Sequence, residues 1–203
     1  MIHVKQKKDR LVLDTSLFVN PEVRHHFGSS PTDAMNGFLQ LAGGITCLEF
    51  YMPASIFQEL MNFVDQKKIP AQLLTIIQQK SPDKHAMTCP AIFIYELVED
   101  MRDRINKGLR IAEKNVRNTA GTEERELIQG MRKQYRDALR EGILDSKEDV
   151  DLILLAKELD ALLVTADNGA IKWADKLGVR WLFPERLKDY LDAYMDNGGE
   201  CIE

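Results

Sequence analysis

Short apolar runs alternate with longer segments of helical periodicity along most of this 203-residue sequence, and this alternation limits the possible folds severely. The runs cover residues 11–13, 46–52, 161–165 and 179–182. Each is bounded by polar or turn-forming residues and is short enough to be a buried strand. Strands separated by helices form a largely parallel sheet that is covered by helices on both faces. The sequence therefore predicts an α/β fold.

The segments between these runs carry helix signals. Pro31 follows a potential N-cap at Ser30, and Pro53 opens a segment in which Ile56 and Leu60 share one helical face. We expect helices from residue 31, from residue 53, over 71–79, over 146–159, over 170–177 and from 184 toward 196.

A longer helical segment interrupts the alternation. Two amphipathic stretches on either side of Gly121 predict an antiparallel helical hairpin inserted into the sheet domain. We therefore expect a sheet domain over 1–90 and 143–203, and an inserted hairpin over 91–142. The first arm carries an apolar stripe at helical spacing: Met101, Ile105, Leu109, Ala112 and Val116. The second arm directs another set inward: Ile128, Met131, Tyr135 and Leu139.

The two predicted domains differ in charge. The chain has 27 basic and 32 acidic residues and a net charge of −5. Residues 101–140 hold eleven basic and six acidic side chains, which makes this segment +5 and the remainder −10. A basic segment on an acidic chain indicates a nucleic-acid-binding face, although a solvated helix surface has the same pattern. The candidate RNA-binding residues are Lys107, Arg110, Lys114, Arg117, Arg125, Arg132, Arg136 and Arg140.

Aspartates follow the predicted strands. Asp14 comes after run 11–13, Asp167 comes after run 161–165, and Asp145, Asp149 and Asp151 surround the start of a helix. Each alone is an ordinary turn or cap residue. If the carboxyl edge of the sheet brings them together, their mutual repulsion requires a cation. Oxygen ligands without His or Cys suit Mg²⁺ or Mn²⁺, and such ions support phosphodiester hydrolysis.

Several other classes are excluded. The chain has neither a Gly-x-Gly-x-x-Gly nor a P-loop motif for nucleotides, and it has no Gly-x-Ser-x-Gly elbow. Cys47, Cys89 and Cys201 are too far apart in sequence to indicate a zinc site or a disulfide framework. No apolar run reaches the roughly 18 residues of a membrane span, and the N-terminus is polar. We expect a cytoplasmic protein without a membrane partner.

Four short motifs resemble the successive acidic motifs of PIN-domain nucleases. They are Leu-Val-Leu-Asp-Thr-Ser at 11–16, Ile-Phe-Gln-Glu-Leu with Glu59, Val-Asp-Leu-Ile-Leu-Leu-Ala with Asp151, and Leu-Leu-Val-Thr-Ala-Asp-Asn at 162–168. With Phe-Val-Asn-Pro at 18–21 and the long insertion, essentially the whole chain resembles the minimal protein-only RNase P group, known as HARP. Members of this group were earlier labelled RNA ligase partner proteins.

The resemblance implies a PIN-like, mostly parallel sheet flanked by helices and a set of active-site residues. The aspartates that match the catalytic set are Asp14, Asp145, Asp149, Asp151 and Asp167. Of these, it implies that Asp14, Asp149, Asp151 and Asp167 hold Mg²⁺ or Mn²⁺. Glu59 matches an acid that many PIN nucleases use, and Ser16 and Thr165 resemble hydroxyls that orient carboxylates.

The activity that the resemblance implies is that of an RNA-free ribonuclease P. Such an enzyme removes the 5′ leader from precursor tRNA by metal-dependent endonucleolytic cleavage and leaves a 5′ phosphate. The resemblance also implies homo-oligomers, in which dimers assemble further, up to a dodecamer. Two alternatives remain open: a toxin-type PIN endoribonuclease, and a non-catalytic RNA-binding adaptor of an RNA ligase.

Overall fold

The computed structural model describes residues 8–88, 90–117, 123–140 and 146–196. The chain divides into two compact units. The first is formed by Met1–Met87 together with Ser146–Glu203, and the second is formed by Thr88–Asp145. The second unit is thus inserted into the sequence of the first.

In the described part of the chain, five strands form one sheet in the order β3-β2-β1-β4-β5. The strands are β1 (Asp9–Leu13), β2 (Leu48–Met52), β3 (Ile77–Gln79), β4 (Leu162–Val164) and β5 (Trp181–Leu182). Every neighbouring pair is parallel, and in the centre Leu11 of β1 pairs with both Phe50 and Leu162. The side chains of residues 11–13 are fully buried, as expected of a strand covered on both faces. The prediction of an α/β fold is confirmed.

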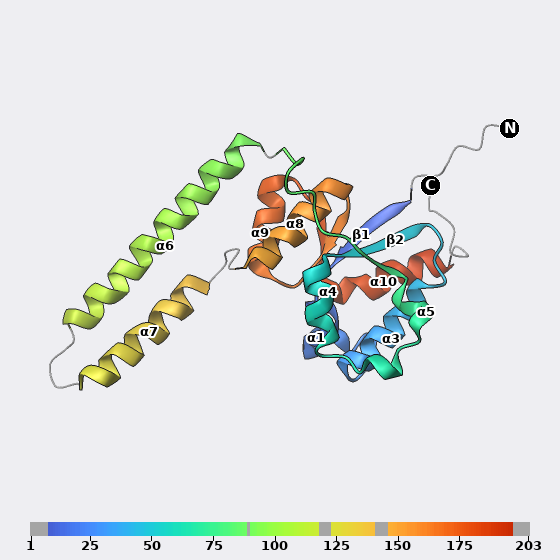
Figure 1. The fold of residues 1–203 in the computed structure, drawn as a ribbon, viewed down its shortest axis with the longest axis horizontal. Coiled ribbons are helices and arrows are strands. Elements are labelled where there is room, and N and C mark those ends of the chain that lie inside the picture. Colours follow the sequence, from blue (N-terminus) through green and yellow to red (C-terminus); the bar gives the residue numbers. More distant parts are fainter. Residues whose placement is uncertain (1–7, 89, 118–122, 141–145, 197–203) are drawn as a thin grey trace. The chain divides into compact units, whose positions relative to one another are not determined.

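Helices cover both faces of this sheet. In the first unit they are α1 (Ser16–Val19), α2 (Pro21–Arg24), α3 (Pro31–Ala42), α4 (Ala54–Met61), η1 (Gln66–Lys68), α5 (Ala71–Leu74), α8 (Lys147–Leu159), α9 (Asn168–Leu177) and α10 (Pro184–Asp196). The direction of strand addition reverses at β1, so right-handed crossovers place α3 on one face and α8 and α9 on the other. Figure 1 shows α8 beside α9, with α3 and α10 across the sheet from them.

Serine side chains cap two of the predicted helices. Ser30 Oγ accepts a hydrogen bond from Asp33 N over 3.2 Å, and Pro31 occupies the first helical position of α3. Ser146 Oγ accepts one from Asp149 N over 3.0 Å at the start of α8. Each serine satisfies a backbone N–H that lacks a partner within its own helix. These caps explain why the helices begin at the predicted residues.

The predicted helix over 71–79 is wrong in its second half. α5 ends at Leu74, and β3 begins at Ile77, which pairs with Phe50 of β2. Residues 75–77 are Thr-Ile-Ile, and their β-branched side chains fit a pleated sheet better than a helix. The edge of β2 therefore determines the structure of this segment more strongly than its local helical spacing.

An aromatic cluster fills the core beneath α3. The Phe38 ring meets Phe18, Phe27 and Phe50 edge to face, with centroid distances of 5.5, 5.8 and 5.3 Å. Phe38 is fully buried. Edge-to-face contacts add stability to the burial of the rings themselves. This cluster holds α3 against the strand that leads into α4.

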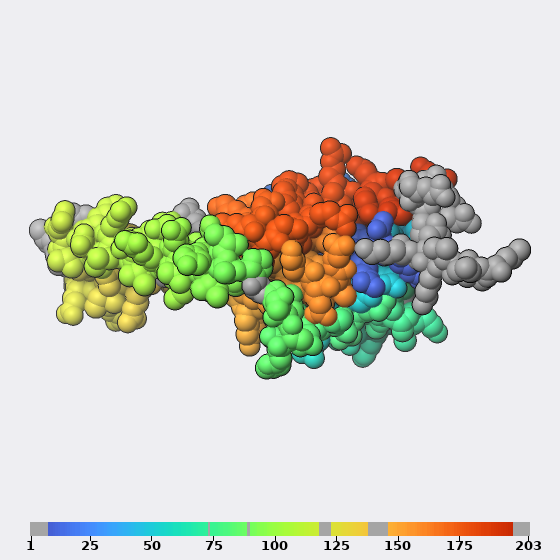
Figure 2. All heavy atoms as spheres, turned by 90° about the horizontal axis from the view of Figure 1, so that it is seen from above, coloured from blue at the N-terminus to red at the C-terminus, as the bar shows by residue number. Residues whose placement is uncertain are grey.

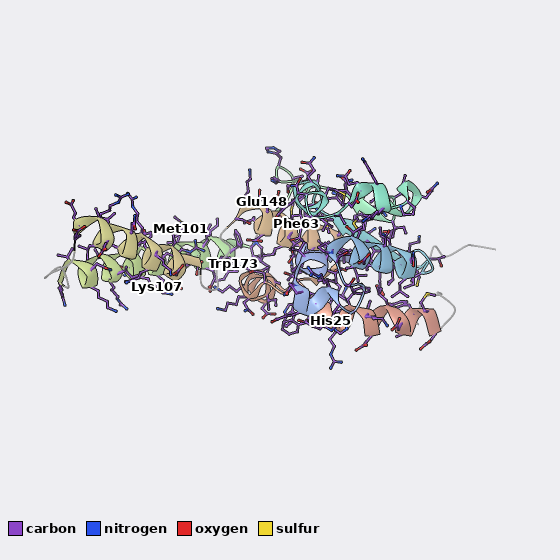
Figure 3. All side chains as sticks on the ribbon, turned by 90° about the horizontal axis from the view of Figure 1, so that it is seen from below. His25, Phe63, Met101, Lys107, Glu148 and Trp173 are labelled. Carbon is purple, nitrogen blue, oxygen red and sulfur yellow. The ribbon has the colours of Figure 1, made fainter. Side chains whose placement is uncertain are left out.

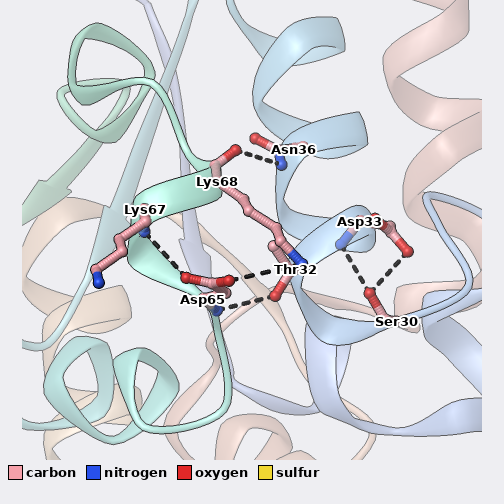
Figure 4. Close-up of polar contacts among 7 residues, drawn as sticks. All are labelled: Ser30, Thr32, Asp33, Asn36, Asp65, Lys67 and Lys68. Atoms are coloured by element: carbon pink, nitrogen blue, oxygen red, sulfur yellow. Dashed lines mark hydrogen bonds and ion pairs between the residues drawn. The ribbon is translucent and has the colours of Figure 1, made fainter.

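A polar network fixes the loop after α4 to α3 (Figure 4). Thr32 Oγ1 accepts a hydrogen bond from Asp65 N over 2.9 Å, and Asn36 Nδ2 donates to Lys68 O over 3.1 Å. Asp65 also accepts from Lys67 N over 3.2 Å and so caps η1. The loop is thereby tied to the helix at both ends of η1.

The second unit is a pair of helices, α6 (Ala91–Arg117) and α7 (Glu124–Arg140). Figure 2 shows their side chains packed against each other. The helices approach tightly at Gly108, where an added Cβ would lie only 2.4 Å from the Tyr135 ring. Gly108 is therefore required for this contact. Despite the length of α6, none of the described helices is long and apolar enough to cross a membrane.

The predicted apolar stripe of α6 exists, but only Ala112 of it lines the groove with residues of α7. Met101, Ile105 and Leu109 are 54%, 65% and 56% exposed, whereas Gly108 is buried under Tyr135. Figure 3 labels Met101 and Lys107 on this helix. The two helices thus meet at Gly108, while Met101, Ile105 and Leu109 present apolar side chains to solvent beside this contact.

Truncating the aromatic cluster should destabilise the first unit. Phe38→Ala is expected to lower the free energy of unfolding by about 3–5 kcal/mol, because it removes buried ring contacts and leaves a cavity. Phe63→Ala serves as the control, since Phe63 is 49% exposed, and surface changes usually alter stability by less than about 0.5 kcal/mol. Urea denaturation followed by circular dichroism measures both variants. Equal effects would contradict the assignment of Phe38 to the core.

Candidate active site

Two of the predicted aspartates follow neighbouring strands at one edge of the sheet. Asp14 comes directly after β1, and Asp167 lies three residues beyond the end of β4. The register pairs Leu13 with Val164, and Asp14 N donates to Val164 O over 3.1 Å. Both aspartates therefore lie at the edge of the sheet formed by the carboxyl ends of its strands, where open α/β sheets have their active sites.

Hydroxyl groups orient the Asp14 carboxylate. Ser16 Oγ and Thr165 Oγ1 both donate to Asp14 Oδ2, over 2.7 and 2.8 Å, and Thr15 Oγ1 donates to Oδ1 over 3.3 Å. Hydrogen bonds to an ionised acceptor are stronger than neutral ones and restrict its rotation. The sequence-based roles of Ser16 and Thr165 are consistent with this geometry.

The Thr165 hydroxyl also connects Asp14 to Asp167. Thr165 is fully buried, and its Oγ1 accepts a hydrogen bond from Asp167 N over 3.1 Å while it donates to Asp14. Asp167 Oδ1 in turn accepts from Ala170 N over 2.7 Å and caps α9. One hydroxyl thus uses both its donor and its acceptor capacity to link two carboxylate-bearing turns.

Asp149 and Asp151 lie in the first turns of α8. This helix packs against β1 and β4 and leads into β4, so its N-terminus lies toward the carboxyl edge of the sheet. Asp149 Oδ2 accepts a hydrogen bond from Ser146 Oγ over 2.8 Å. The helix start therefore presents two acids near the edge that carries Asp14.

Asp151 is paired with a lysine. Lys84 Nζ lies 2.7 Å from Oδ1 and 2.8 Å from Oδ2 of Asp151, whose residue exposure is only 8%. Lys84 comes from the segment after β3 and is half exposed. A nearly buried carboxylate is stable only when a positive charge or hydrogen bonds compensate for its lost hydration.

Glu158, two turns further along α8, holds the same segment. Its carboxylate accepts a hydrogen bond from Lys80 Nζ over 2.5 Å and from Asp83 N over 2.8 Å. The Lys80 ammonium and then the Asp83 amide hold the pKa of Glu158 below its ordinary value. Glu158 therefore fixes segment 80–83 along the surface of α8.

The two remaining predicted acids are Glu59 and Asp145. Glu59 is exposed on α4, and no hydrogen bond in the described residues joins it to Asp14 or Asp167. Asp145 lies outside the described residues. The structure thus joins Asp14 with Asp167, and places Asp149 and Asp151 together on α8.

The donors available at this edge suit a hard divalent cation in their chemistry. They are carboxylate and hydroxyl oxygens, and the Asp151 carboxylate already takes a positive partner. Among the residues that the structure describes, no three His, Cys, Asp or Glu side chains are grouped closely enough to hold an ion. The types of ligand therefore fit a divalent ion, while the described carboxylates form no group of three.

The predicted RNA-binding residues lie on the second unit. On α6 the side chains of Lys107, Arg110, Lys114 and Arg117 are exposed, and on α7 so are those of Arg125, Arg132 and Arg136. The side chain of Arg140 lies outside the described residues. A groove of about 710 Å³ opens on this unit and combines apolar and basic walls, formed by Ala112, Gln129, Met131, Arg132, Lys133, Tyr135 and Arg136.

Comparison with known proteins identifies the class. A family model described as PINc domain ribonuclease matches residues 10–196, which include both the sheet and the inserted helices. The chain is therefore a PIN-domain nuclease, an enzyme that hydrolyses RNA, and the resemblance seen in its acidic motifs is confirmed. Nucleases of this class generally use divalent metal ions.

Full-length relatives identify the family. The chain is 57% identical over 191 residues to the RNA-free ribonuclease P of Thermodesulfovibrio yellowstonii, covering 94% of this chain and 97% of the relative. It is 47% identical to that of Pyrococcus abyssi and 40% identical to that of Nitrosococcus oceani, with 92% and 91% of this chain covered, and 93% and 94% of the relatives. The chain belongs to the RNA-free ribonuclease P family. This assignment favours an endoribonuclease over an adaptor.

Sequence reasoning missed Lys84 and Glu158. Lys84 is 67 residues away from Asp151 in the chain, and it follows a strand that the sequence did not reveal. The only available signal was a basic residue shortly after an apolar segment, a common surface pattern. Contacts of this kind depend on how a loop crosses a helix, which no local motif encodes.

Acidification should release segment 80–83 from α8. Because the folded-state pKa of Glu158 is lowered, its bonds stabilise the fold fully above the ordinary value of 4.5 and are lost as pH falls through the folded-state pKa. We expect the hydrogen-exchange protection factor of the Asp83 amide to fall over this range, while the amides of β1 stay protected. Glu158→Gln should remove the pH dependence. Protection of the Asp83 amide that stays constant while the Glu158 carboxylate becomes protonated would contradict the clamp.

Proposed function

We propose that this chain removes the 5′ leader from precursor tRNA and leaves a 5′ phosphate on the product. The observation that carries the proposal is the hydroxyl-linked pair of Asp14 and Asp167 at the carboxyl edge of the sheet. Membership of the RNA-free ribonuclease P family supports the choice of substrate, since the relatives carry that name over nearly their whole length. A toxin-type PIN endoribonuclease is disfavoured for the same reason.

We propose Asp14, Asp149, Asp151 and Asp167 as the residues that hold Mg²⁺ or Mn²⁺, with Asp145 as a further catalytic aspartate. A divalent ion bound there would activate a water molecule and stabilise charge on the scissile phosphate. Asp14 is the best prepared of these ligands, because Ser16 and Thr165 fix one of its oxygens. Glu59 remains a proposed accessory acid.

The chain's own hydroxyl and backbone groups orient the carboxylates of this proposed site. Buried Thr165 holds Asp14 and the Asp167 backbone in one arrangement, so neither carboxylate has to be ordered when substrate arrives. Asp167 caps α9 through one oxygen. At the start of α8, Ser146 Oγ donates a hydrogen bond to Asp149 Oδ2 and so orients the Asp149 carboxylate.

Removing one charge from the proposed ligands should abolish cleavage. Asp14→Asn, Asp149→Asn and Asp167→Asn are each expected to reduce cleavage at least about 100-fold, since even outer partners of metal ligands alter function by 10–100-fold. The fold should persist, because Asn has nearly the same size and shape as Asp and, at the N-cap position of Asp167, caps a helix about as well. The assay uses 5′-labelled precursor tRNA with Mg²⁺ or EDTA and maps the cut, with circular dichroism as the folding control. Near-normal turnover in all three variants would refute the proposal.

We propose that the second unit binds the folded RNA through phosphate contacts. Its exposed basic side chains on α6 and α7, and the groove lined by Arg132 and Arg136, support this role. Duplex RNA is recognised mostly by shape and by its backbone rather than by base edges. The aspartates of the first unit would then carry out the cleavage, and these basic residues of the second unit would bind the RNA.

Reversing charges on α6 should weaken RNA binding without affecting the aspartates. Arg110→Glu, Lys114→Glu and Arg117→Glu in one variant are expected to lower precursor tRNA affinity and to flatten its salt dependence by about one unit per lost phosphate contact. A variant with Lys67→Glu and Lys172→Glu, which alters exposed lysines of the first unit, is the control. Unchanged affinity of the α6 variant would show that this surface does not contact RNA.

We propose that the exposed apolar stripe of α6 joins copies of this chain. Stripes of this kind on a soluble protein mark interaction sites, and the predicted homo-oligomer supplies a partner with the same stripe. Light scattering on the wild type is expected to give a mass of two chains or more. The same measurement on the α6 charge variant separates loss of RNA contact from loss of assembly.

A further inference from the structure

The ion pair between Lys84 and Asp151 lies within the proposed metal-holding set. The Lys84 ammonium contacts both oxygens of a carboxylate that has little access to water. Asp14, in contrast, is held by the hydroxyl groups of its neighbours. Asp151 therefore differs from Asp14 in having a full positive charge as its partner.

The segment that carries Lys84 is held against α8, and this places Lys84 near Asp151. Glu158 binds the Lys80 ammonium and the Asp83 amide, and Pro82 between them is buried. The backbone beside Lys84 is thereby fixed along α8, while the lysine side chain stays 53% exposed and reaches Asp151. A fixed backbone with a long, half-exposed side chain allows the ammonium to leave the carboxylate without unfolding the segment.

We propose that Lys84 is a resident cation that neutralises Asp151 until a divalent ion displaces it. The inference rests on the proposed function, since it takes Asp151 to be a metal ligand. An ammonium and a divalent cation compete for the same carboxylate oxygens, because the repulsion between two positive charges in contact is large at a partly buried site. Lys84 is thus a positioning residue that keeps Asp151 ordered in the metal-free protein and lowers its affinity for metal.

The competition makes two measurable properties change in opposite directions. Lys84→Met is expected to bind Mn²⁺ about 10-fold more tightly, the scale on which partners of metal ligands alter affinity. Without metal, the same variant should melt a few degrees lower, because Asp151 loses its partner. Added Mn²⁺ should remove this difference in melting temperature, because the ion replaces the lost positive partner of Asp151. A purely structural lysine would lower stability without tightening metal binding.

The experiment measures free Mn²⁺ by electron paramagnetic resonance during titration of each protein, and melting temperature with and without Mn²⁺. Lys84→Arg should retain near-wild-type behaviour. Lys188→Met, which breaks an exposed Lys–Asp pair with Asp192 outside the site, is the matched control and should leave Mn²⁺ affinity unchanged. In an Asp151→Asn background, Lys84→Met should have no effect on Mn²⁺ binding.

The outcomes separate this inference from the proposed function. If the wild type binds Mn²⁺ and Asp14→Asn weakens that binding, the metal site stands. Unchanged or weaker binding by Lys84→Met would then overturn the role of Lys84 alone. If the wild type binds no Mn²⁺, the proposed metal-dependent function fails and this inference fails with it.

Discussion

The buried hydroxyl of Thr165 is the contact on which the site depends. It donates to Asp14 and accepts from the Asp167 backbone, so it joins the turns that follow two neighbouring parallel strands. This arrangement requires β1 and β4 to be adjacent and in register, because a shift of one residue would turn Thr165 toward the opposite face. The aromatic and aliphatic core that sets the register therefore also sets the geometry of the carboxylates.

Much of the fold follows from local sequence, because strands buried on both faces read as apolar runs and helix starts carry their own caps. The run 11–13 and the N-caps Ser30 and Ser146 are cases in which local and tertiary preferences agree. The helix predicted over 71–79 was wrong in its second half, because residues from Ile77 onward pair with the edge of β2 and form β3. The contacts of α6 were also not predictable, because α7 approaches at Gly108, which is not part of the predicted stripe, and leaves Met101, Ile105 and Leu109 exposed.

The site itself was predictable only in part. Acids after strands are visible in the sequence, and topology brings Asp14 and Asp167 to one edge. Their pairing through Thr165, and the lysine at Asp151, depend on side chains that meet across 151 and 67 residues of chain. The electrostatic picture changes accordingly. A carboxylate cluster read from sequence implies unrelieved repulsion, whereas the folded chain supplies hydroxyls to Asp14 and an ammonium to Asp151.

Affinity cleavage with Fe²⁺ in place of Mg²⁺ tests most directly whether these carboxylates form one metal centre. Bound iron with ascorbate and peroxide generates radicals that cut the nearby backbone. The measurement does not depend on the number of chains in the assembly. The account predicts cuts near residues 14, 149–151 and 165–167 that excess Mg²⁺ suppresses and that Asp14→Asn removes. Cuts confined to other parts of the chain, or cuts that Mg²⁺ does not suppress, would contradict it.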